Sequence, residues 1–411
     1  MKILMIYENP FQALINIDSR VQRESESLSK AGFDVSFFLL FYYNDVEKDI
    51  GKFGNQNITI LGAAKQPLNC PENVGFLRKI VWKFISSKNI YRLLGLTGKV
   101  LTLFKLGFLV PYKGFESLKT LLTIPTDVYH AHDYSTLRYA RFCAWFNKKP
   151  FIYDTHEFWS GIGGSSTRNI RRFFESFHLS KAYAVISVSH EVSKILAKLY
   201  KNPKQVVVSN FPVYRELPSN RKLRDKINVS DNTPIVIYVG AFIPGRGVEP
   251  LLAAAKYLKN VKFVFMGFGM LKDKIINEIE KQEMKNVLII DAVPSNEVID
   301  WTSSADIGIC TFEKIHENYY LTMPNKIGEC LMAGIPVVVS DFPEMRKPVI
   351  NDDVGVVCDP SDPKDIIRAI KELIEPNNYK RKKQNVLKVR KKYSWDNEEK
   401  RLIELYKSLK N

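Results

Sequence analysis

The chain has 411 residues, 45% of them apolar, and its 60 Lys and Arg against 44 Asp and Glu give a formal charge of +16. This length predicts two or three domains, and the ordinary apolar fraction excludes a disordered, collagen-like or disulfide-scaffold protein. The five cysteines are odd in number and form no C-x-x-C pair. We therefore expect reduced thiols in a cytosol, and neither a zinc site nor a disulfide framework.

The sequence predicts no membrane-spanning helix. Its longest apolar run, residues 35–43, has nine residues, against the ~20 that a helix needs to cross a bilayer. The N-terminal sequence MKILMIYENP has one lysine and a short apolar run that polar residues and a proline end. This pattern predicts a first strand and not a signal peptide.

Short β-rich runs alternate with amphipathic helical patterns, such as the one over residues 19–30. Strands are expected at 2–7, 35–40, 58–61, 128–130, 151–154, 184–188 and 206–209. After a polar stretch at 212–233, further strands are expected at 235–239, 261–266, 287–290, 307–310 and 337–340. Strands separated by helices of about 10–15 residues predict parallel sheets, so we expect two doubly wound α/β domains.

The excess positive charge is concentrated in residues 73–120 and 380–411, each with a net charge of +8. Within the first segment, residues 76–85 (FLRKIVWKFI) place apolar side chains at helical spacing beside basic ones. Such a helix suits an anionic membrane surface, or it packs on its own sheet with its lysines in water. The second segment carries no nucleic-acid-binding motif and leads into an expected helix at 395–409, so no nucleic-acid partner is predicted.

Polar residues gather after two successive strands of the first half. The segments DVYHAHD and PFIYDTHE place His130, His132, His156 and Glu157 at strand ends, where open parallel sheets bind ligands. The spacing fits neither H-E-x-x-H nor a two-histidine-one-carboxylate pattern, so we predict no metal site. A loop histidine that meets a substrate is favoured, and His130 suits a structural role.

Glycine-rich loops follow two strands of the second half. After the strand IVIYV, Gly240 and Gly247 flank Arg246 just before a helix. A helix N-terminus with a nearby guanidinium suits a phosphate, although a plain turn with a solvated arginine fits equally well. Gly267 and Gly269 form a second, less specific G-x-G turn.

The segment MPNKIGECLMAGIPVVVSD (323–341) predicts a helix with Pro324 at its first position. Lys326 lies in the first turn, where a basic residue is electrostatically unfavourable unless an anion answers it. Glu329 shares its face and could accept hydrogen bonds from the two hydroxyls of a ribose. A surface Lys–Glu pair would also explain this spacing.

Together these motifs resemble the family-4 retaining glycosyltransferases of GT-B fold, of the type that builds bacterial cell-surface polysaccharides. The resemblance spans the whole chain and is carried by R-x-x-x-E-x-x-x-L-x-x-x-G-x-x-V at 20–35 and by residues 127–133, 154–157, 240–247, 267–269 and 324–341. It implies an acceptor-binding Rossmann-like domain over 1–211 and a nucleotide-sugar-binding one over 212–392, with the active site in the cleft between them. A C-terminal helix in 393–411 would cross back to the first domain.

The resemblance also implies which residues contact the donor: Gly240, Arg246, Gly267, Gly269, Asn325, Lys326, Glu329 and His156. Arg246 and the amides near Gly240 would hold the diphosphate, Glu329 the ribose, and His156 the transferred sugar near the reacting carbon. The two later glycines would let the base and phosphates approach, and Asn325 and Lys326 would line the diphosphate and sugar pocket. His156, Arg246, Lys326 and Glu329 are thus the expected catalytic residues.

Two features depart from the family pattern and bear on donor identity. The first glutamate of the usual E-x7-E pair is Leu321 here, and Glu313 or Glu317 could replace it. The usual arginine at the start of the glycine loop is Ala241, and the usual lysine of its K-G pair is Arg246.

The expected reaction moves a sugar from a nucleotide diphosphate sugar to an acceptor hydroxyl of a lipid-linked or cell-surface glycan, with retention of configuration. No D-x-D occurs in the chain, so we expect fixed cations to replace a metal ion, and no cofactor. A lipid-linked acceptor favours a cytoplasmic protein on the inner face of the membrane. A sugar-nucleotide epimerase of similar fold is the alternative, distinguished by turnover without an acceptor.

Overall fold

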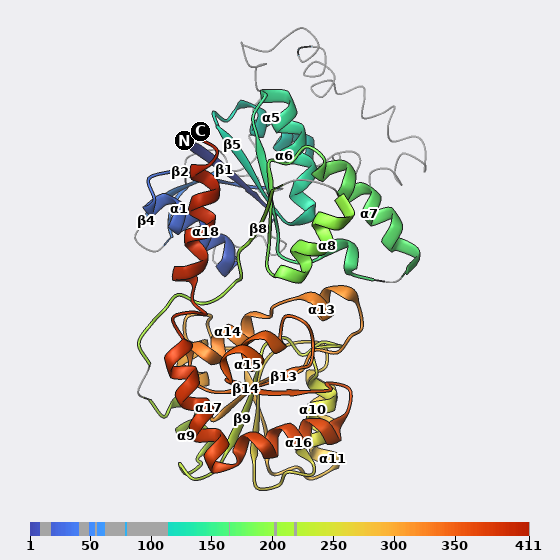
Figure 1. Cartoon of the computed structure of the whole chain (residues 1–411), viewed down its shortest axis with the longest axis vertical. Coiled ribbons are helices and arrows are strands. Elements are labelled where there is room, and N and C mark those ends of the chain that lie inside the picture. The colour runs from blue at the N-terminus through green and yellow to red at the C-terminus, as the bar shows by residue number, and fades with distance from the viewer. Residues whose placement is uncertain are drawn as a thin grey trace. The chain divides into compact units, whose positions relative to one another are not determined.

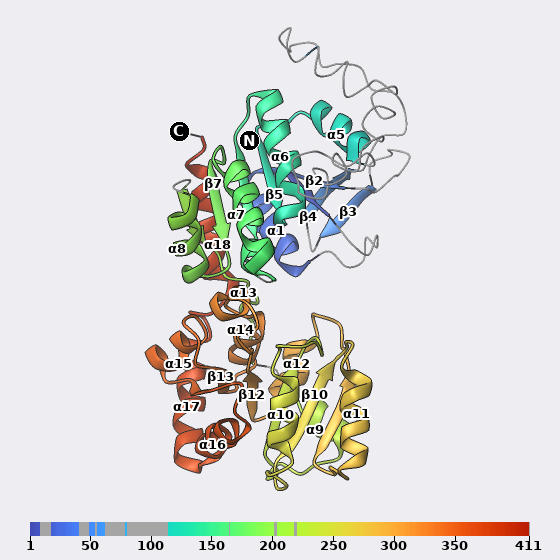
Figure 2. The same cartoon turned by 90° about the vertical axis from the view of Figure 1, so that its right-hand side faces the viewer.

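The computed structural model describes residues 1–8, 18–40, 49–53, 56–61, 79, 114–163, 165–200, 204–217 and 220–410. The chain divides into two compact units, drawn in Figures 1 and 2. The N-terminal unit comprises Met1–Val208 with Glu399–Asn411, and the C-terminal unit comprises Ser209–Glu398. Most of the last helix, α18 (Trp395–Lys407), therefore belongs to the N-terminal unit.

The N-terminal unit is built on an eight-stranded sheet with the order β3-β4-β2-β1-β5-β6-β7-β8. Its strands are β1 (Lys2–Tyr7), β2 (Asp34–Leu39), β3 (Asp49–Phe53), β4 (Gln56–Leu61), β5 (Val128–His132), β6 (Phe151–Thr155), β7 (Ala184–Ser187) and β8 (Lys204–Val207). All neighbours run parallel except β3 and β4. The strand order reverses beside β1, and the crevice at such a reversal is where open α/β sheets bind ligands.

Helices cover this sheet and bring distant segments together. They are α1 (Ser19–Lys30), α5 (Gly114–Thr123), α6 (Asp133–Asn147), the 3₁₀ turn η1 (Trp159–Gly161), α7 (Ser165–Leu179), α8 (His190–Tyr200) and α18. Helix α1 begins at Asp18, whose carboxylate accepts the Arg20 N–H at 2.7 Å, as an N-cap should. Helix α18 lies beside α1 in Figure 1, and Ser27 Oγ donates to the Glu399 carboxylate at 2.6 Å.

The C-terminal unit contains an all-parallel six-stranded sheet with the order β11-β10-β9-β12-β13-β14. Its strands are β9 (Ile235–Val239), β10 (Lys262–Gly267), β11 (Val287–Asp291), β12 (Ile307–Cys310), β13 (Val337–Ser340) and β14 (Gly355–Cys358). Its helices are α9 (Lys222–Ile227), α10 (Val248–Ala255), α11 (Lys272–Lys281), α12 (Val298–Ser303), α13 (Glu317–Leu321), α14 (Asn325–Met332), α15 (Arg346–Asp352), α16 (Pro363–Ile374) and α17 (Pro376–Val389).

Alternate residues of these strands enter two separate cores, one on each face of the sheet. On β9, Ile235 and Ile237 pack with α9, α12, α14, α15 and α17, whereas Val236 and Tyr238 pack with α10, α11 and α16. A strand buried on both faces has to be apolar at every position, and IVIYV meets that requirement. Figure 1 shows the second group of helices together at the lower right of this unit.

The predicted architecture of two doubly wound sheets, parallel but for the β3–β4 pair, is confirmed. The bounds of α1, β1, β9, β12 and β13 are those expected from the sequence. Strands β3 and β14 were not predicted, and the polar stretch at 212–233 contains the short helix α9. The predicted basic helix at 76–85 lies outside the described residues except for Lys79. Among the helices that the structure describes, none is long and apolar enough to cross a membrane.

Candidate active site

Lys326 lies against the glycine that ends the central strand of the C-terminal unit. It is the second residue of α14, its exposed fraction is 8%, and its Nζ lies 3.7 Å from the centroid of the Tyr238 ring. A Cβ on Gly240 would lie 2.7 Å from Lys326 Cε. Gly240 also has a φ of +125°, so a side chain there would be strained and would displace the lysine.

The ammonium group of Lys326 makes no hydrogen bond within the described part of the chain. Burial lowers its pKa to about 8, and the positive charge of Arg246 acts in the same direction. A buried ammonium without a hydrogen-bond partner is unfavourable unless an anion answers it. The surface Lys–Glu pair considered from the sequence is wrong for Lys326, because this side chain is buried.

Arg246 is held in one orientation by aromatic side chains. Its Nε donates to Tyr319 Oη at 2.9 Å, and its guanidinium carbon lies 4.6 Å from the Phe312 centroid and 4.8 Å from the Tyr319 centroid. Lys326 Nζ lies 5.5 Å from the same Phe312 centroid. The two cations therefore share one aromatic wall, which fixes the guanidinium fork and excludes water around it.

Gly267 and Gly269 pack the next strand's loop against the loop that follows β9. A Cβ on Gly267 would lie 2.0 Å from the Gly240 carbonyl oxygen, and one on Gly269 would lie 2.5 Å from the Phe242 carbonyl oxygen. The Gly240 N–H donates to the Met266 carbonyl at 2.9 Å. Close backbone packing therefore requires glycine at these two positions, in addition to the approach of a ligand that the sequence suggested.

The remaining residues predicted in this unit lie on α14 or beside the glycine loop. Asn325 begins α14 and is exposed, and Glu329 follows Lys326 by one turn and is half-buried. Leu321, at the position of the usual first glutamate, is buried. Of the two residues proposed to replace the missing glutamate, Glu313 lies on the loop between β12 and α13. Its N–H donates to the Gly245 carbonyl at 2.9 Å, and its carboxylate accepts the Gly247 N–H.

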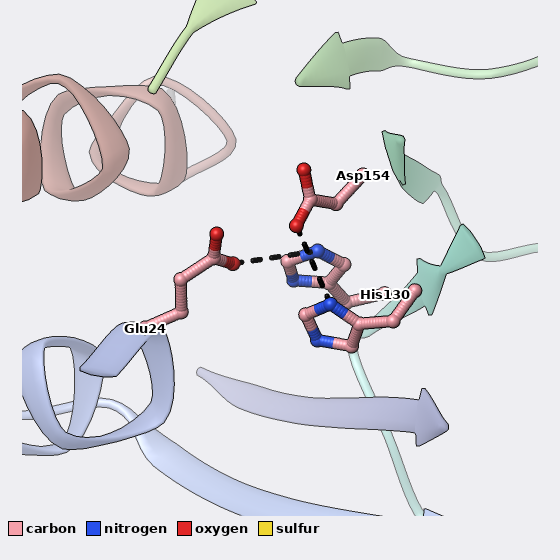
Figure 3. A group of neighbouring side chains, drawn as sticks. Glu24, His130 and Asp154 are labelled. Atoms are coloured by element: carbon pink, nitrogen blue, oxygen red, sulfur yellow. Dashed lines mark ion pairs between the residues drawn. The ribbon is translucent and has the colours of Figure 1, made fainter. Parts of the chain in front are cut away.

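A second group of ionisable side chains is buried in the N-terminal unit. Figure 3 shows Glu24 of α1 and Asp154 of β6 pointing toward imidazole rings, one of which is His130 of β5. Arg20 of α1 clamps Asp154 with its Nε at 2.8 Å and its Nη2 at 2.7 Å, and its Nη1 donates to the Val208 carbonyl at 2.6 Å. A bidentate guanidinium–carboxylate pair therefore ties α1 to β6 and to the end of β8.

His130 has the structural role that its position suggested. It is fully buried, its Nδ1 lies 2.6 Å from Tyr406 Oη of α18, and its Nε2 lies 3.7 Å from Glu24 Oε2. Burial holds the pKa of His130 well below its usual value, so the ring is neutral. The contact with Tyr406 could not be predicted from the sequence near His130, because the two residues are 276 positions apart.

Glu24, His130, His132 and Asp154 each offer one potential metal-ligand atom, and these atoms lie within 4.8 Å of one another. The Arg20 guanidinium, however, already contacts both carboxylates, with its Nε 3.0 Å from Glu24 Oε1. A divalent ion would stand beside this fixed cation and be repelled by it. That the enzyme works without a metal ion is a prediction that this geometry does not test.

The two buried carboxyl groups, Glu24 and Asp154, have pKa values shifted in opposite directions. Burial and the neighbouring Asp154 charge raise the pKa of Glu24 well above its usual value. Burial would also raise the pKa of Asp154, but the attraction of Arg20 outweighs it and holds that pKa well below its usual value. The two carboxyl groups of this cluster are therefore shifted in opposite directions, and the proton is held more tightly by Glu24 than by Asp154.

His156, the one predicted donor-contacting residue of the N-terminal unit, lies at the edge of this cluster. Its Nε2 is 3.2 Å from Asp154 Oδ2 and 3.3 Å from His132 Nδ1. Its Nδ1 is 3.4 Å from Asp133 Oδ2, and its backbone N–H donates to Asp133 Oδ1 at 3.1 Å. Asp133 closes the DVYHAHD motif but was not among the residues predicted to act at the site.

Two family models divide the chain between them. The model described as "Glycosyl transferase 4-like domain" matches residues 17–210, and "Glycosyl transferases group 1" matches residues 219–391. The chain belongs to the family-4-type glycosyltransferases. An uncharacterized glycosyltransferase of Methanocaldococcus jannaschii is 24% identical over 68% of this chain and 75% of its own.

Solved structures share the fold of this glycosyltransferase along nearly its whole length. Sucrose-phosphate synthase from Thermosynechococcus elongatus has a TM-score of 0.72 and 16% identity, covering 99% of this chain and 98% of its own. Anabaena HepE in complex with UDP and glucose has a TM-score of 0.70 and 15% identity, covering 99% of this chain and all of its own. These likenesses show the GT-B fold.

Proposed function

We propose that this glycosyltransferase moves a sugar from a nucleotide diphosphate sugar to an acceptor hydroxyl, with retention of anomeric configuration and without a bound metal ion. The observation that carries the proposal is the buried, unpaired ammonium of Lys326 beside Gly240. A diphosphate is the anion that answers it. The structural neighbour HepE, solved with UDP and glucose, supports a nucleoside diphosphate in this role.

The proposed catalysis rests on charge that develops as the donor breaks. The bond between the anomeric carbon and the diphosphate oxygen lengthens, and negative charge grows on the leaving group. Arg246 and Lys326, already fixed by aromatic contacts, stabilise that charge with no reorganisation. They thereby take the place of a divalent ion.

The acceptor oxygen attacks the anomeric carbon on the face that the diphosphate leaves. Its proton passes to an oxygen of the departing diphosphate, so one C–O bond forms, one breaks, and no separate base is needed. In this assignment Glu329 binds the ribose, Asn325 and the glycine loops line the donor, and His156 contacts the transferred sugar.

The assignment is tested by Arg246→Ala with a panel of nucleotide diphosphate sugars. Loss of one fixed electrostatic donor should lower turnover by ~10²–10³. Arg221→Ala, which removes a surface arginine of the same unit, is the matched control and should keep full turnover. Wild-type turnover in Arg246→Ala would overturn the assignment, and epimerisation of a donor without acceptor would indicate the epimerase instead.

We also propose that the acceptor is lipid-linked and that the N-terminal unit contacts an anionic membrane. The supporting feature is an α6–α7 surface made of Trp145, Ile170, Phe173 and Phe177, each between 40% and 60% exposed. The Arg141 guanidinium carbon lies 3.8 Å from the Phe177 centroid, and α7 also carries three arginines. Aromatic side chains beside arginines suit the headgroup region of an anionic bilayer.

Vesicle flotation tests this surface. The wild-type protein should float with vesicles that contain anionic lipid and not with neutral ones. A Phe173→Ser/Phe177→Ser variant should lose most of that binding, whereas Tyr257→Ser, at an exposed aromatic residue of the C-terminal unit, should retain it. Equal flotation of the double variant and the wild type would contradict a role of the α6–α7 surface.

A further inference from the structure

The side chain of Phe268 is exposed, although the loop that carries it is held in place. Its exposed fraction is 67%, and its ring contacts no other ring or cation in the part of the chain that the structure describes. The Phe268 carbonyl accepts the Phe242 N–H at 2.7 Å, and the Leu271 N–H donates to the Phe242 carbonyl at 3.0 Å. The loop between β10 and α11 is therefore fixed to its neighbour while the phenyl ring remains uncovered.

Phe268 lies next to the residues that surround the unpaired ammonium of Lys326. The glycines on either side of it, Gly267 and Gly269, pack without a side chain against the loop that follows β9. A Cβ on Gly267 would meet the Gly240 carbonyl, and a Cβ on Gly240 would meet the Lys326 side chain. Phe268 is thus the bulky side chain of the turn that borders the Lys326 site.

Its place in the fold distinguishes Phe268 from Tyr257, the other exposed aromatic residue within the described residues 209–217 and 220–398. Tyr257 is 70% exposed and follows α10, which returns the chain to the amino ends of the strands. Phe268 follows the carboxyl end of β10, and open parallel sheets bind their ligands at that edge. An exposed ring at this edge is available to a ligand.

We propose that the nucleobase of the donor stacks on the ring of Phe268. This inference rests on the proposed function, which places the donor diphosphate at Arg246 and Lys326. In a nucleoside diphosphate one ribose separates the base from the phosphates, so the base must lie near the side chains that hold the diphosphate. Every nucleobase has an aromatic face, and an exposed phenyl ring offers the complementary surface.

The chemistry of Phe268 assigns it to the base and to no other part of the donor. A phenyl ring has no hydrogen-bonding group, so it can neither neutralise a diphosphate nor bind the hydroxyls of a ribose. Stacking depends on the face of a base and not on its hydrogen-bonding edge. Phe268 should therefore favour a nucleotide over inorganic diphosphate without selecting one base from the others.

The test compares ligands that have a base with one that has none, by titration calorimetry on the full-length chain. UDP, ADP, GDP and inorganic diphosphate are titrated into the wild type and each variant. Phe268→Ala should weaken binding of the tightest nucleotide roughly 5- to 100-fold, the effect of losing one base–aromatic stack, and leave binding of inorganic diphosphate unchanged. Lys326→Met should weaken binding of both. Tyr257→Ala is the matched control and should change neither.

Phe268→Trp supplies a rescue and a direct signal. Tryptophan also stacks on bases, so this variant should keep the nucleotide affinity of the wild type. Its added fluorescence, measured as the difference from the wild type, should change when the nucleotide binds and stay constant with inorganic diphosphate. An unchanged signal with bound nucleotide would contradict a base on this ring.

Wild-type nucleotide affinity in Phe268→Ala, or an equal loss for nucleotide and inorganic diphosphate, would overturn the inference. A wild-type protein that binds no nucleotide would overturn both this inference and the proposed function. The two are otherwise separable. Nucleotide binding that depends on Phe268, without sugar transfer, would refute the proposed reaction and leave the base contact standing, whereas sugar transfer with unchanged nucleotide affinity in Phe268→Ala would do the reverse.

Discussion

Arg20 in the N-terminal unit and Lys326 in the C-terminal unit are both buried cations, and they differ in the partners that the chain provides for them. Arg20 is 1% exposed, and its guanidinium donates hydrogen bonds to the Asp154 carboxylate and the Val208 carbonyl. Lys326 is 8% exposed, and its ammonium has no hydrogen-bond partner among the described residues. A cation that is paired internally holds a structure together, whereas an unpaired one marks the place of an external anion.

The largest expected effect comes from breaking the paired cation. Arg20→Met would leave the Asp154 carboxylate buried without its partner, and removing one member of a buried ion pair costs about 3–5 kcal/mol. Hydrogen exchange in β5 and β6 should therefore become much faster, while exchange in β9 and β12 stays unchanged. Arg221→Met, which removes a surface ion pair with Asp225, is the control and should leave both patterns as they are.

Replacing the unpaired cation should stabilise the folded protein instead of destabilising it. Lys326→Met keeps the length of the side chain and removes a buried charge, so the protein without donor should become more stable by about 1–3 kcal/mol. Because the pKa of Lys326 is lowered to about 8, its unfavourable contribution is present below pH 8 and disappears as the pH rises toward 10. The increase in the urea unfolding midpoint of Lys326→Met should therefore be largest below pH 8 and should vanish toward pH 10. A loss of stability at pH 7 would contradict an unpaired ammonium.

A smaller effect should follow from loosening Arg246 without removing it. Tyr319→Phe keeps the ring beneath the guanidinium and deletes the hydroxyl that accepts from Nε. One hydrogen bond of this kind contributes about 0.5–1.5 kcal/mol, so turnover should fall roughly 3- to 10-fold. Tyr257→Phe, at an exposed tyrosine, should change nothing. A loss as large as that of Arg246→Ala would mean that Tyr319 itself acts on the substrate.

The fold was predictable because its main signals are local. The run IVIYV is apolar at every position and VVVS at its first three, and both lie between polar or turn residues, so β9 and β13 were expected with the bounds they have. Strand β3 (DIGKF) has no such run and is an edge strand defined by its antiparallel pairing with β4. Strand β14 (GVVC) has only two β-branched residues, between a glycine and a cysteine, so its run is less distinct than that of β13.

The site was predictable only in part because its decisive properties depend on packing. A lysine in the first turn of α14 and a glycine after β9 pointed to an anion, but the burial of Lys326 against Tyr238 depends on the folded sheet. In the N-terminal unit, the R-x-x-x-E pattern identified Arg20 and Glu24. Their pairing with Asp154, more than 130 residues along the chain, could not be inferred from spacing.

The most direct test of the central claim, that Lys326 awaits a diphosphate, is the number of protons taken up when UDP binds. At pH 8.5 a lysine with a pKa of about 8 is mostly neutral, and an adjacent diphosphate favours its charged form. Titration calorimetry in buffers of different ionisation enthalpy should show uptake of about 0.5–0.8 proton per UDP in the wild type and none in Lys326→Met, which should also bind UDP far more weakly. Tight binding of UDP by the wild type without proton uptake, or unchanged affinity in Lys326→Met, would contradict the account.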